Sequence, residues 1–324
     1  MSRFLLACVP ALALLMQGSH GIHRKLFGLS DIDLQPSMTP DHEHIALSTE
    51  TLDVSDPSVI LRALATSYPD RIHLVKLRDG DWSVQVNDTT YYWAEGRLLP
   101  RELRHKHDDF SPYRFYPYPA ELPPLRALSA EERERLNDAI DRREAKKIIR
   151  YPGFLNSLWG MENFKEAEET VIRIDMLGHN VRIHPELQKP LAQVEADILR
   201  AAETDIAVSN WLEELEEVSA YVWRKIAGSS NRSLHSYGIA IDLEPSDYKG
   251  KQIYWRWTRD FYDDWWAVRY EERYMIPRSV VQIFEDHGFI WGGKWFLFDQ
   301  IHFEYRPELI VLNNWRNANY KPHR

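Results

Sequence analysis

The residues best suited to chemistry lie in one short stretch, residues 232–243, which read RSLHSYGIAIDL. From residue 238 onward, small or acidic residues alternate with aliphatic ones, which predicts a strand with one apolar face. Asp242 lies on the other face among small residues, and His235 lies in the loop that enters the strand. An imidazole and a carboxylate could therefore converge at one point.

A second cluster lies downstream in residues 291–305, which read WGGKWFLFDQIHFEY. Apolar residues alternate with His302 and Glu304, which predicts another strand with one polar face. Two histidines and one aspartate would provide three metal ligands and leave a fourth position for water, as in catalytic zinc sites. A carboxylate near that water could serve as general base, and Asp299 is well placed for this role.

The first stretch resembles a known family. The pattern Ser-x-His-x-x-Gly-x-Ala-x-Asp, matched in full from Ser233 to Asp242, is the signature of zinc D-alanyl-D-alanine carboxypeptidases and related murein metallopeptidases. The second stretch, Trp-Gly-Gly-x-Trp followed by Asp-x-x-His-Phe, looks most like the L-alanyl-D-glutamate endopeptidase branch. The resemblance covers about residues 180–312 and nothing before them.

The resemblance implies a role for individual residues. His235, Asp242 and His302 would bind zinc, and Asp299 would be the catalytic carboxylate. An arginine ahead of the first motif would hold a substrate oxygen. Arg224, in the sequence Tyr-Val-Trp-Arg, takes that place, and the competing interpretation is an ordinary surface ion pair.

Three further residues are candidates for substrate contacts or for supporting the ligands. Ser233 is expected to support the loop through hydrogen bonds, and Tyr237 lies in the same loop. Glu304 has two interpretations, since it could replace Asp299 as the base or could orient a ligand imidazole.

The function implied by the resemblance is zinc-dependent hydrolysis of a peptide bond in peptidoglycan stem peptides. The motif does not distinguish D-Ala-D-Ala carboxypeptidase from related endopeptidase activities, and the ligands also admit other divalent metals. The alternative is a catalytically inactive, zinc-stabilised binding module, because Hedgehog signalling domains share this zinc fold and use it more for binding. The presence of Asp299 favours the enzyme.

The strands and helices predicted around these residues indicate an α+β fold, in which helices pack on a small antiparallel sheet in the zinc-peptidase domain. Upstream, residues 72–77 and 82–86 alternate around Asp79-Gly80 and predict a hairpin, with a third strand at 89–94. A short apolar helical patch covers 59–64, and the proline-rich stretch around 112–124 is typical of a semi-rigid linker.

Two helices follow. Ser129 and Glu132 form a capping box for a highly charged helix that we expect to reach about Arg150. An amphipathic helix is predicted from about Pro185, with apolar residues at helical spacing at Leu187, Leu191, Val194, Ile198 and Leu199. Residues 254–295 then contain six of the twelve tryptophans, which would form either a wall of the substrate cleft or a packed core.

The N-terminus predicts export. Residues 1–21 combine Arg3 with a short apolar run and small residues before Gly21, as in a signal peptide, so we expect a periplasmic or extracellular protein. Cys8 follows Leu-Leu-Ala, which offers lipoprotein processing as the alternative. Because it is the single cysteine, a disulfide framework and a cysteine-rich zinc site are excluded.

The remaining chain divides into an accessory region at 22–124 with the meander and proline-rich linker, a helical connector at 125–180 and the zinc peptidase domain at 181–324.

Hydrophobic residues make up 44% and charged residues 27%, as in globular proteins. The formal net charge of −9 argues against nucleic acid as a partner. No apolar stretch of the mature chain is long enough to be transmembrane, and no pattern indicates an oligomeric state.

Overall fold

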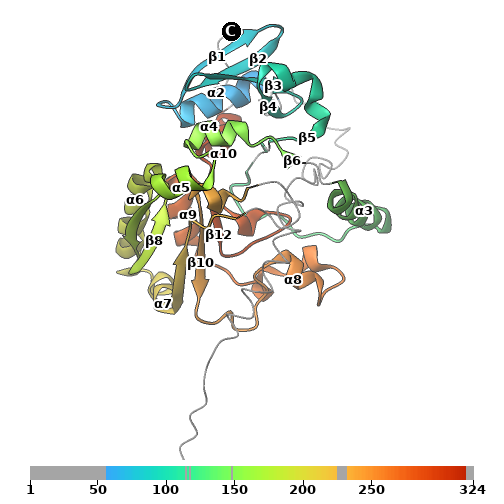
Figure 1. The fold of residues 1–324 in the computed structure, drawn as a ribbon. Coiled ribbons are helices and arrows are strands. Elements are labelled where there is room, and N and C mark those ends of the chain that lie inside the picture. Colours follow the sequence, from blue (N-terminus) through green and yellow to red (C-terminus); the bar gives the residue numbers. More distant parts are fainter. Residues whose placement is uncertain (1–55, 114, 117, 147–148, 225–231, 319–324) are drawn as a thin grey trace, which may run out of the picture.

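The computed structural model describes residues 56–113, 115–116, 118–146, 149–224 and 232–318. The predicted signal peptide, with Cys8, and the start of the accessory region lie outside the described residues. The predicted α+β fold is confirmed, with an N-terminal sheet at one end of the molecule and a second sheet among the helices of the C-terminal half (Figure 1).

The N-terminal sheet is the predicted meander with one additional strand. It runs antiparallel in the order β1 (Ile72–Arg78), β2 (Asp81–Val86), β3 (Thr89–Ala94) and β4 (Arg97–Leu99). Asp79 and Gly80 both have positive φ, as this type of two-residue hairpin turn requires. Glu95 and Gly96 repeat that geometry before β4, a strand that was not predicted from the sequence.

Helix α2 (Pro57–Ser67) packs against this sheet. The side chain of Asp56 accepts a hydrogen bond from the Ser58 N–H (2.8 Å), and Pro57 occupies the first turn, where its missing N–H costs nothing. The predicted helical patch at 59–64 is confirmed, since its apolar side chains are buried. Helix α2 also packs against α10 (Pro307–Asn317) of the C-terminal half.

The middle of the chain contains short elements: η2 (Arg101–Asp109), β5 (Phe110–Ser111), α3 (Ala130–Lys146), β6 (Ile149–Arg150), α4 (Gly153–Trp159) and α5 (Phe164–Thr170). The predicted capping box is present, because Ser129 Oγ accepts from the Glu132 N–H (3.2 Å) and Glu132 accepts from the Ser129 N–H (2.8 Å). The expected extension of this helix to Arg150 is wrong. Pro152 disfavours helix just before it, and β6 pairs with β5 instead.

The proline-rich stretch does more than connect two regions. Tyr118 is 1% exposed, its hydroxyl donates to Glu285, and it accepts the Trp291 N–H (3.0 Å). Lys294 forms an ion pair with Glu285 (2.6 Å) and donates to the Ala120 carbonyl (2.7 Å). These buried polar contacts dock the stretch against the C-terminal half.

The C-terminal sheet is antiparallel in the order β11-β12-β10-β9, formed by β9 (Leu215–Ser219), β10 (Ala240–Pro245), β11 (Phe289–Trp291) and β12 (His302–Tyr305). A separate hairpin of β7 (Ile172–Met176) and β8 (His179–Ile183) precedes it. This hairpin was not predicted, although Leu177 and Gly178, both with positive φ, form its two-residue turn.

The remaining helices are α6 (Gln188–Ala202), α7 (Ile206–Glu214), α8 (Trp255–Arg259) and α9 (Arg278–Asp286), with 3₁₀ turns η3 (Pro185–Leu187), η4 (Leu234–Tyr237), η5 (Trp265–Ala267), η6 (Tyr270–Glu272) and η7 (Gly292–Lys294). The predicted amphipathic helix corresponds to η3 and α6. Leu191, Val194 and Ile198 are fully buried, whereas Leu199 is 51% exposed and does not belong to the apolar face.

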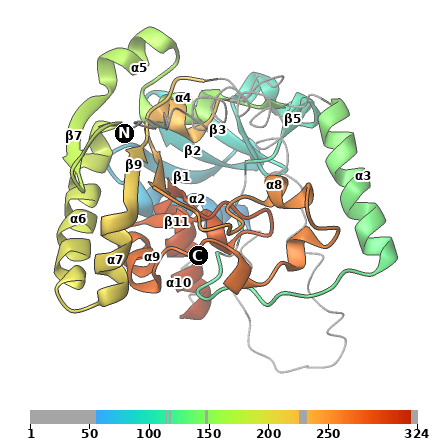
Figure 2. The same cartoon turned by 90° about the horizontal axis from the view of Figure 1, so that it is seen from below.

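One hydrophobic core extends through both halves. Its buried members include Leu61 of α2, Val84 of β2, Ile241 of β10 and Phe303 of β12. Helices α4 and α10 lie between the two sheets in Figure 1, and Figure 2 shows α3 at the edge of the molecule opposite α6. The N-terminal sheet is therefore packed against the C-terminal half as part of the same folded body.

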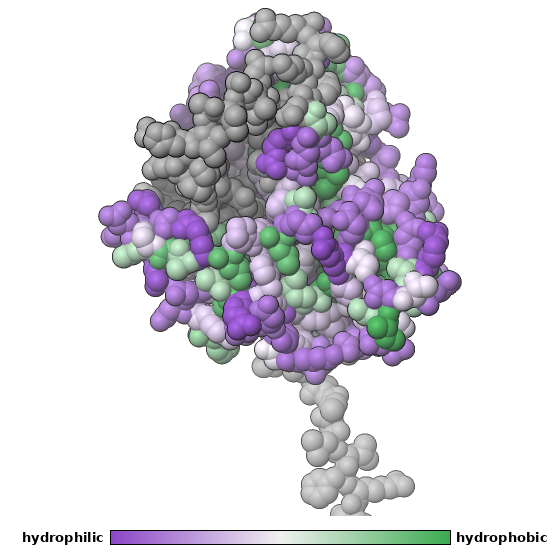
Figure 3. Space-filling model, turned by 180° about the vertical axis from the view of Figure 1, so that it is seen from behind, coloured by the Kyte–Doolittle hydropathy of each residue, from purple (hydrophilic) through white to green (hydrophobic). Residues whose placement is uncertain are grey.

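No helix in the described parts of the chain is both long enough and apolar enough to cross a membrane. On the face seen from behind, hydrophobic residues are scattered in small groups among hydrophilic ones (Figure 3).

Candidate metal centre

His235 is held by a tight turn that the local sequence specifies. Ser233 caps η4, since its Oγ accepts a hydrogen bond from the His235 N–H (3.2 Å). Gly238 ends the turn with a φ of +63°, and a Cβ there would lie 2.6 Å from the backbone nitrogen of His184. Glycine is thus required for both the conformation and the close approach of β8. The turn leads directly into β10.

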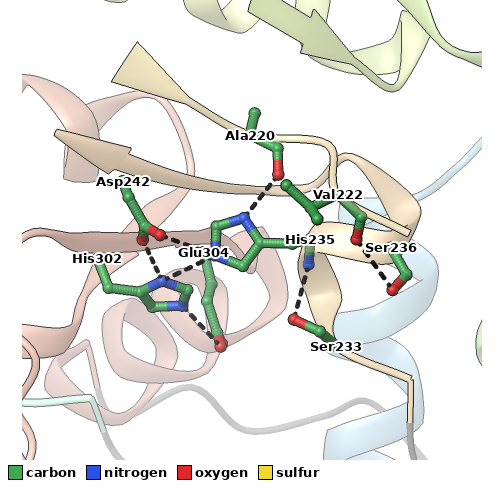
Figure 4. A network of polar contacts seen from close by, with 8 residues as sticks. All are labelled: Ala220, Val222, Ser233, His235, Ser236, Asp242, His302 and Glu304. Carbon is green, nitrogen blue, oxygen red and sulfur yellow. Dashed lines mark hydrogen bonds and ion pairs between the residues drawn. The ribbon is translucent and has the colours of Figure 1, made fainter. Parts of the chain in front are cut away.

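The pairing of β10 with β12 brings the second and third candidate ligands together. Asp242 lies directly opposite His302 in the antiparallel register, where facing side chains are close neighbours. Asp242 Oδ1 is 2.7 Å from His302 Nδ1, and Asp242 Oδ2 is 3.3 Å from His235 Nε2. His235 Nε2 and His302 Nδ1 are 3.3 Å apart, so the three side chains converge (Figure 4).

The other nitrogen of each imidazole is already engaged. His235 Nδ1 is 2.6 Å from the Ala220 carbonyl oxygen, which can only accept, so Nδ1 carries the hydrogen. His302 Nε2 lies 3.3 Å from Glu304 Oε1 and donates to that carboxylate. His235 Nε2 and His302 Nδ1 therefore both face Asp242 and would be the metal-binding nitrogens, as in metal sites where outer hydrogen bonds orient the histidine ligands (Figure 4).

These donors fit a zinc ion. Ligand atoms about 2.0–2.1 Å from a tetrahedral ion lie about 3.3–3.4 Å from one another. The separation of His235 Nε2 from His302 Nδ1 and its separation from Asp242 Oδ2 both equal that value, whereas the other oxygen, Asp242 Oδ1, is at hydrogen-bond distance from His302 Nδ1. His235 and His302 are 2% and 5% exposed, and the three donor atoms lie within 4.8 Å of one another.

The charge state of Asp242 suits a metal ligand. Burial raises the pKa of its carboxyl group, but the charges and hydrogen bonds of His235 and His302 outweigh burial and hold the pKa well below its usual value. A carboxylate that stays ionised can bind a cation without first losing a proton.

Asp299 lies next to this group on the segment that leads into β12. The Asp299 N–H donates to the Gly292 carbonyl (3.0 Å), and a Cβ at Gly292 would lie 2.6 Å from the Asp299 carbonyl oxygen. The chain also pairs here with Tyr254. Burial, together with the charge of Asp242, raises the pKa of Asp299 to about 7. Such a carboxylate exchanges protons near neutral pH, as a general base must.

Arg224 is placed beside the same carboxylates. Its backbone N–H donates to Ser236 Oγ (3.0 Å), which fixes the chain close to η4. Burial lowers the pKa of the Arg224 guanidinium, while the charges of Asp242 and Asp299 act to raise it. The side chain is therefore within electrostatic reach of the metal ligand and of the candidate base.

The other sequence candidates occupy supporting positions. Glu304 contacts His302 directly; although burial raises the pKa of its carboxyl group, the hydrogen bond from His302 keeps the pKa below its usual value. The hydroxyl of Tyr237 donates to Asn156 Oδ1 in α4 (2.6 Å), and the guanidinium of Arg232 lies 3.9 Å from its ring centroid. Tyr237 thus anchors the turn to α4.

The tryptophans of residues 254–295 divide between the two roles considered above. Trp255, Trp265, Trp266 and Trp291 are at most 7% exposed and form core. Trp295 is partly exposed, and its ring centroid is 5.6 Å from that of His302, so it forms one side of the site.

Residues 227–305 match the family model described as D-alanyl-D-alanine carboxypeptidase. This part of the chain is a domain of that family. The match confirms the resemblance inferred from the sequence, and it includes the three candidate ligands, Asp299 and Glu304. Arg224 precedes the matched residues.

A second match lies in the N-terminal half. Residues 60–115 match a model described as a domain of unknown function, which includes the meander and most of α2. In the same comparisons, no curated protein and no solved structure matched the chain. The two matched regions thus contribute to one hydrophobic core.

Several residues that contact the site were not predicted from the sequence. Ala220 contacts His235 through its backbone carbonyl, and the type of its side chain gives no indication of this contact. Arg306 and Glu308 extend the alternation of polar residues that begins at His302 and Glu304, and this two-residue period was a readable signal.

Proposed function

We propose that this protein is a zinc-dependent peptidase that hydrolyses a peptide bond in peptidoglycan stem peptides, as a D-Ala-D-Ala carboxypeptidase or a related endopeptidase. The observation that carries the proposal lies within the carboxypeptidase domain. There, His235, Asp242 and His302 converge while a second carboxylate, Asp299, lies partly buried within electrostatic reach of Asp242 and His302.

The residues divide the chemistry among themselves. His235, Asp242 and His302 would hold the metal, which when bound supplies Lewis-acid chemistry by acidifying water and polarising a carbonyl group. The Asp299 carboxylate accepts a proton from the attacking water as its oxygen bonds to the scissile carbonyl carbon. Asp299 then returns the proton to the leaving amine as the C–N bond breaks, which regenerates the carboxylate.

Arg224 is proposed to bind the substrate oxygen on which negative charge develops. A guanidinium donates several hydrogen bonds in a fixed plane and keeps its charge even when buried. Its proximity to Asp242 and Asp299 supports this role. The interaction strengthens as charge accumulates in the transition state, so it accelerates the reaction rather than only binding the substrate.

The proposed setting is outside the cytoplasm. The signal-peptide pattern of residues 1–21 supports export to the periplasm or the extracellular space, where peptidoglycan is found. Lipoprotein processing at Cys8 would instead anchor the protein to a membrane.

The test is mass spectrometry of purified muropeptides incubated with the protein, with chelator, and with chelator followed by excess zinc. We expect products that chelator abolishes and zinc restores, and the mass lost from the substrate identifies the bond cut. Loss of terminal alanine would indicate a carboxypeptidase, and loss of a larger fragment an endopeptidase.

Zinc content must be measured on the same samples. Intact muropeptides incubated with protein that carries one zinc ion per chain would refute the hydrolase and favour the zinc-stabilised binding module. Cleavage that survives complete removal of metal would refute the metal-dependent mechanism.

A further inference from the structure

A buried row of charged residues continues from the metal site into the interior. His302, Glu304, Arg306 and Glu308 alternate with apolar residues along β12 and into the first turn of α10. Their exposed fractions are 5%, 9%, 7% and 0%. Charged groups are rarely buried to this extent unless each is paired, so the contacts of every member matter.

Each member contacts the next. His302 Nε2 donates to Glu304 Oε1 (3.3 Å), and Glu304 Oε2 lies 3.7 Å from Arg306 Nη1. Arg306 Nε donates to Glu308 Oε1. The second oxygen of Glu308 accepts a hydrogen bond from the hydroxyl of Tyr68 (2.8 Å). The row therefore runs without a break from the candidate ligand to Tyr68.

Tyr68 belongs to the other half of the molecule. It is the C-cap residue that follows α2, it lies within the match to the domain of unknown function, and 240 positions separate it from Glu308. It is 7% exposed. The ring of Tyr113, from the same domain, lies 5.1 Å from the Arg306 guanidinium. Two aromatic residues of the N-terminal half thus enclose the inner end of the row.

The charges along the row support one fixed arrangement. Burial lowers the pKa of Arg306, but the charge of Glu308 outweighs burial and raises the pKa well above its usual value. Burial and the charge of Glu308 raise the pKa of Tyr68, so its hydroxyl remains a donor. A planar guanidinium between two carboxylates, one of them pinned by a tyrosine, has little freedom to rotate.

We propose that Tyr68 is a positioning residue for His302, acting through Glu308, Arg306 and Glu304, so that the N-terminal domain sets the metal affinity of the peptidase domain. This inference rests on the metal site of the proposed function but not on hydrolysis. It gives the domain of unknown function a defined task, which is to hold the partners of a metal ligand in place.

The experiment compares Tyr68→Phe with Tyr91→Phe. Tyr91 is a matched control in the same domain, because it is 2% exposed and its hydroxyl bonds to the Gly153 carbonyl (2.8 Å) and Ser157 Oγ (2.6 Å), outside the row. Zn²⁺ affinity is measured on metal-free protein by competition with a chromophoric chelator. The visible absorption spectrum of the Co²⁺-loaded protein reports ligand geometry, which a general loss of stability would not change.

Removing the direct partner of a ligand histidine weakens metal binding about 10–100-fold, and this is the effect expected for Glu304→Gln. Tyr68→Phe acts from the far end of the row, so we expect a smaller loss of Zn²⁺ affinity, about 3–10-fold, and shifted Co²⁺ bands. Tyr91→Phe should leave the affinity and the spectrum at their wild-type values.

Equal Zn²⁺ affinities and identical Co²⁺ spectra for the two tyrosine variants would overturn the proposal. If Tyr68→Phe fails to fold, Arg306→Lys provides the same test, since it keeps the charge but removes the planar contact with both carboxylates. Wild-type protein that binds no Zn²⁺ would instead refute the proposed function, so the two failures are distinguishable.

Discussion

His302 links the candidate metal site to the buried row of charged residues. One ring nitrogen faces His235 and Asp242, and the other contacts Glu304. Burial lowers the pKa of His302, but Asp242 and Glu304 outweigh burial and raise the pKa well above its usual value. A metal ion must therefore displace a proton from this ring, so metal binding weakens as the pH falls.

A substitution at Asp299 should separate metal binding from catalysis. Asn in place of Asp299 keeps the shape of the side chain but cannot accept the proton of the attacking water. We expect kcat/KM for muropeptide cleavage to fall about 10²–10⁴-fold, with zinc content unchanged. The comparison variant, His235→Ala, should lose both zinc and cleavage. Undiminished turnover by the Asp299→Asn protein would remove Asp299 from the mechanism.

At the scale of elements, two close approaches bring the ligands together. Gly238 allows β8 to pass against η4, with a hydrogen bond from the His184 N–H to the Gly238 carbonyl (3.0 Å). Gly292 allows the Asp299 segment to lie against η7. Strand pairing brings two of the ligands together, because the register of β10 and β12 places Asp242 opposite His302. The site is therefore built by contacts between elements.

Replacing Gly238 tests this arrangement, with Gly250 as the control. Both have positive φ, +63° and +69°, but a Cβ at Gly250 meets nothing within 4 Å. Gly250→Ala should cost about 1 kcal/mol of unfolding free energy from backbone strain alone. Gly238→Ala adds a backbone collision, and we expect about 3 kcal/mol or more. Denaturant titrations give both values, and equal losses would show that the collision is relieved without cost.

The buried His184 is expected to make the free energy of unfolding depend on pH. It is 1% exposed, its Nε2 donates to the Trp159 carbonyl (2.9 Å), and its Nδ1 accepts the Glu186 N–H (3.1 Å). Burial lowers the pKa of His184 to about 4, whereas the unfolded chain protonates at its ordinary value of 6.5. The unfolded state thus gains a proton first, and stability falls as the pH drops from 6.5 to 4.

The loss of unfolding free energy attributed to His184 should reach about 3 kcal/mol at and below pH 4. His184→Asn can still cap η3 but does not titrate. Its unfolding free energy should be lower than wild type at pH 7.5 and should depend less steeply on pH between 6.5 and 4. Parallel pH profiles for the two proteins would exclude His184 as the source.

At the scale of the whole molecule, the two matched domains are one folded body. They share a hydrophobic core, α2 packs on α10, and the proline-rich stretch docks Tyr118 against Glu285. A ligand of the C-terminal site should therefore stabilise the N-terminal sheet as well.

Zinc binding is expected to reveal this coupling. Zn²⁺ at 100 times its Kd stabilises the protein that binds it by about 2.7 kcal/mol. Because the core is continuous, we expect a single thermal unfolding transition that zinc moves upward, and greater protection from hydrogen exchange in β2 and β3 as well as in β10 and β12. Two transitions, with only the second sensitive to zinc, would contradict a shared folding unit.

Local features of the sequence determined much of the fold. The Asp79-Gly80 turn, the capping box of Ser129 and Glu132, and the alternation around His302 each depend on backbone conformation and on side-chain period. Such signals act over a few residues, so they can be read without knowledge of the rest of the chain. The spacing of His235 and Asp242 along the chain is another signal that acts over a few residues.

Tertiary structure alone decided which distant residues meet. The lengths of α3 and β6, the exposure of Leu199 and the burial of most tryptophans depend on what packs against them. The hydrogen bond from Tyr68 to Glu308 joins residues 240 positions apart. Long-range contacts of this kind arise from the packing of whole elements, whose free energy is a sum over many neighbours rather than a property of any one residue.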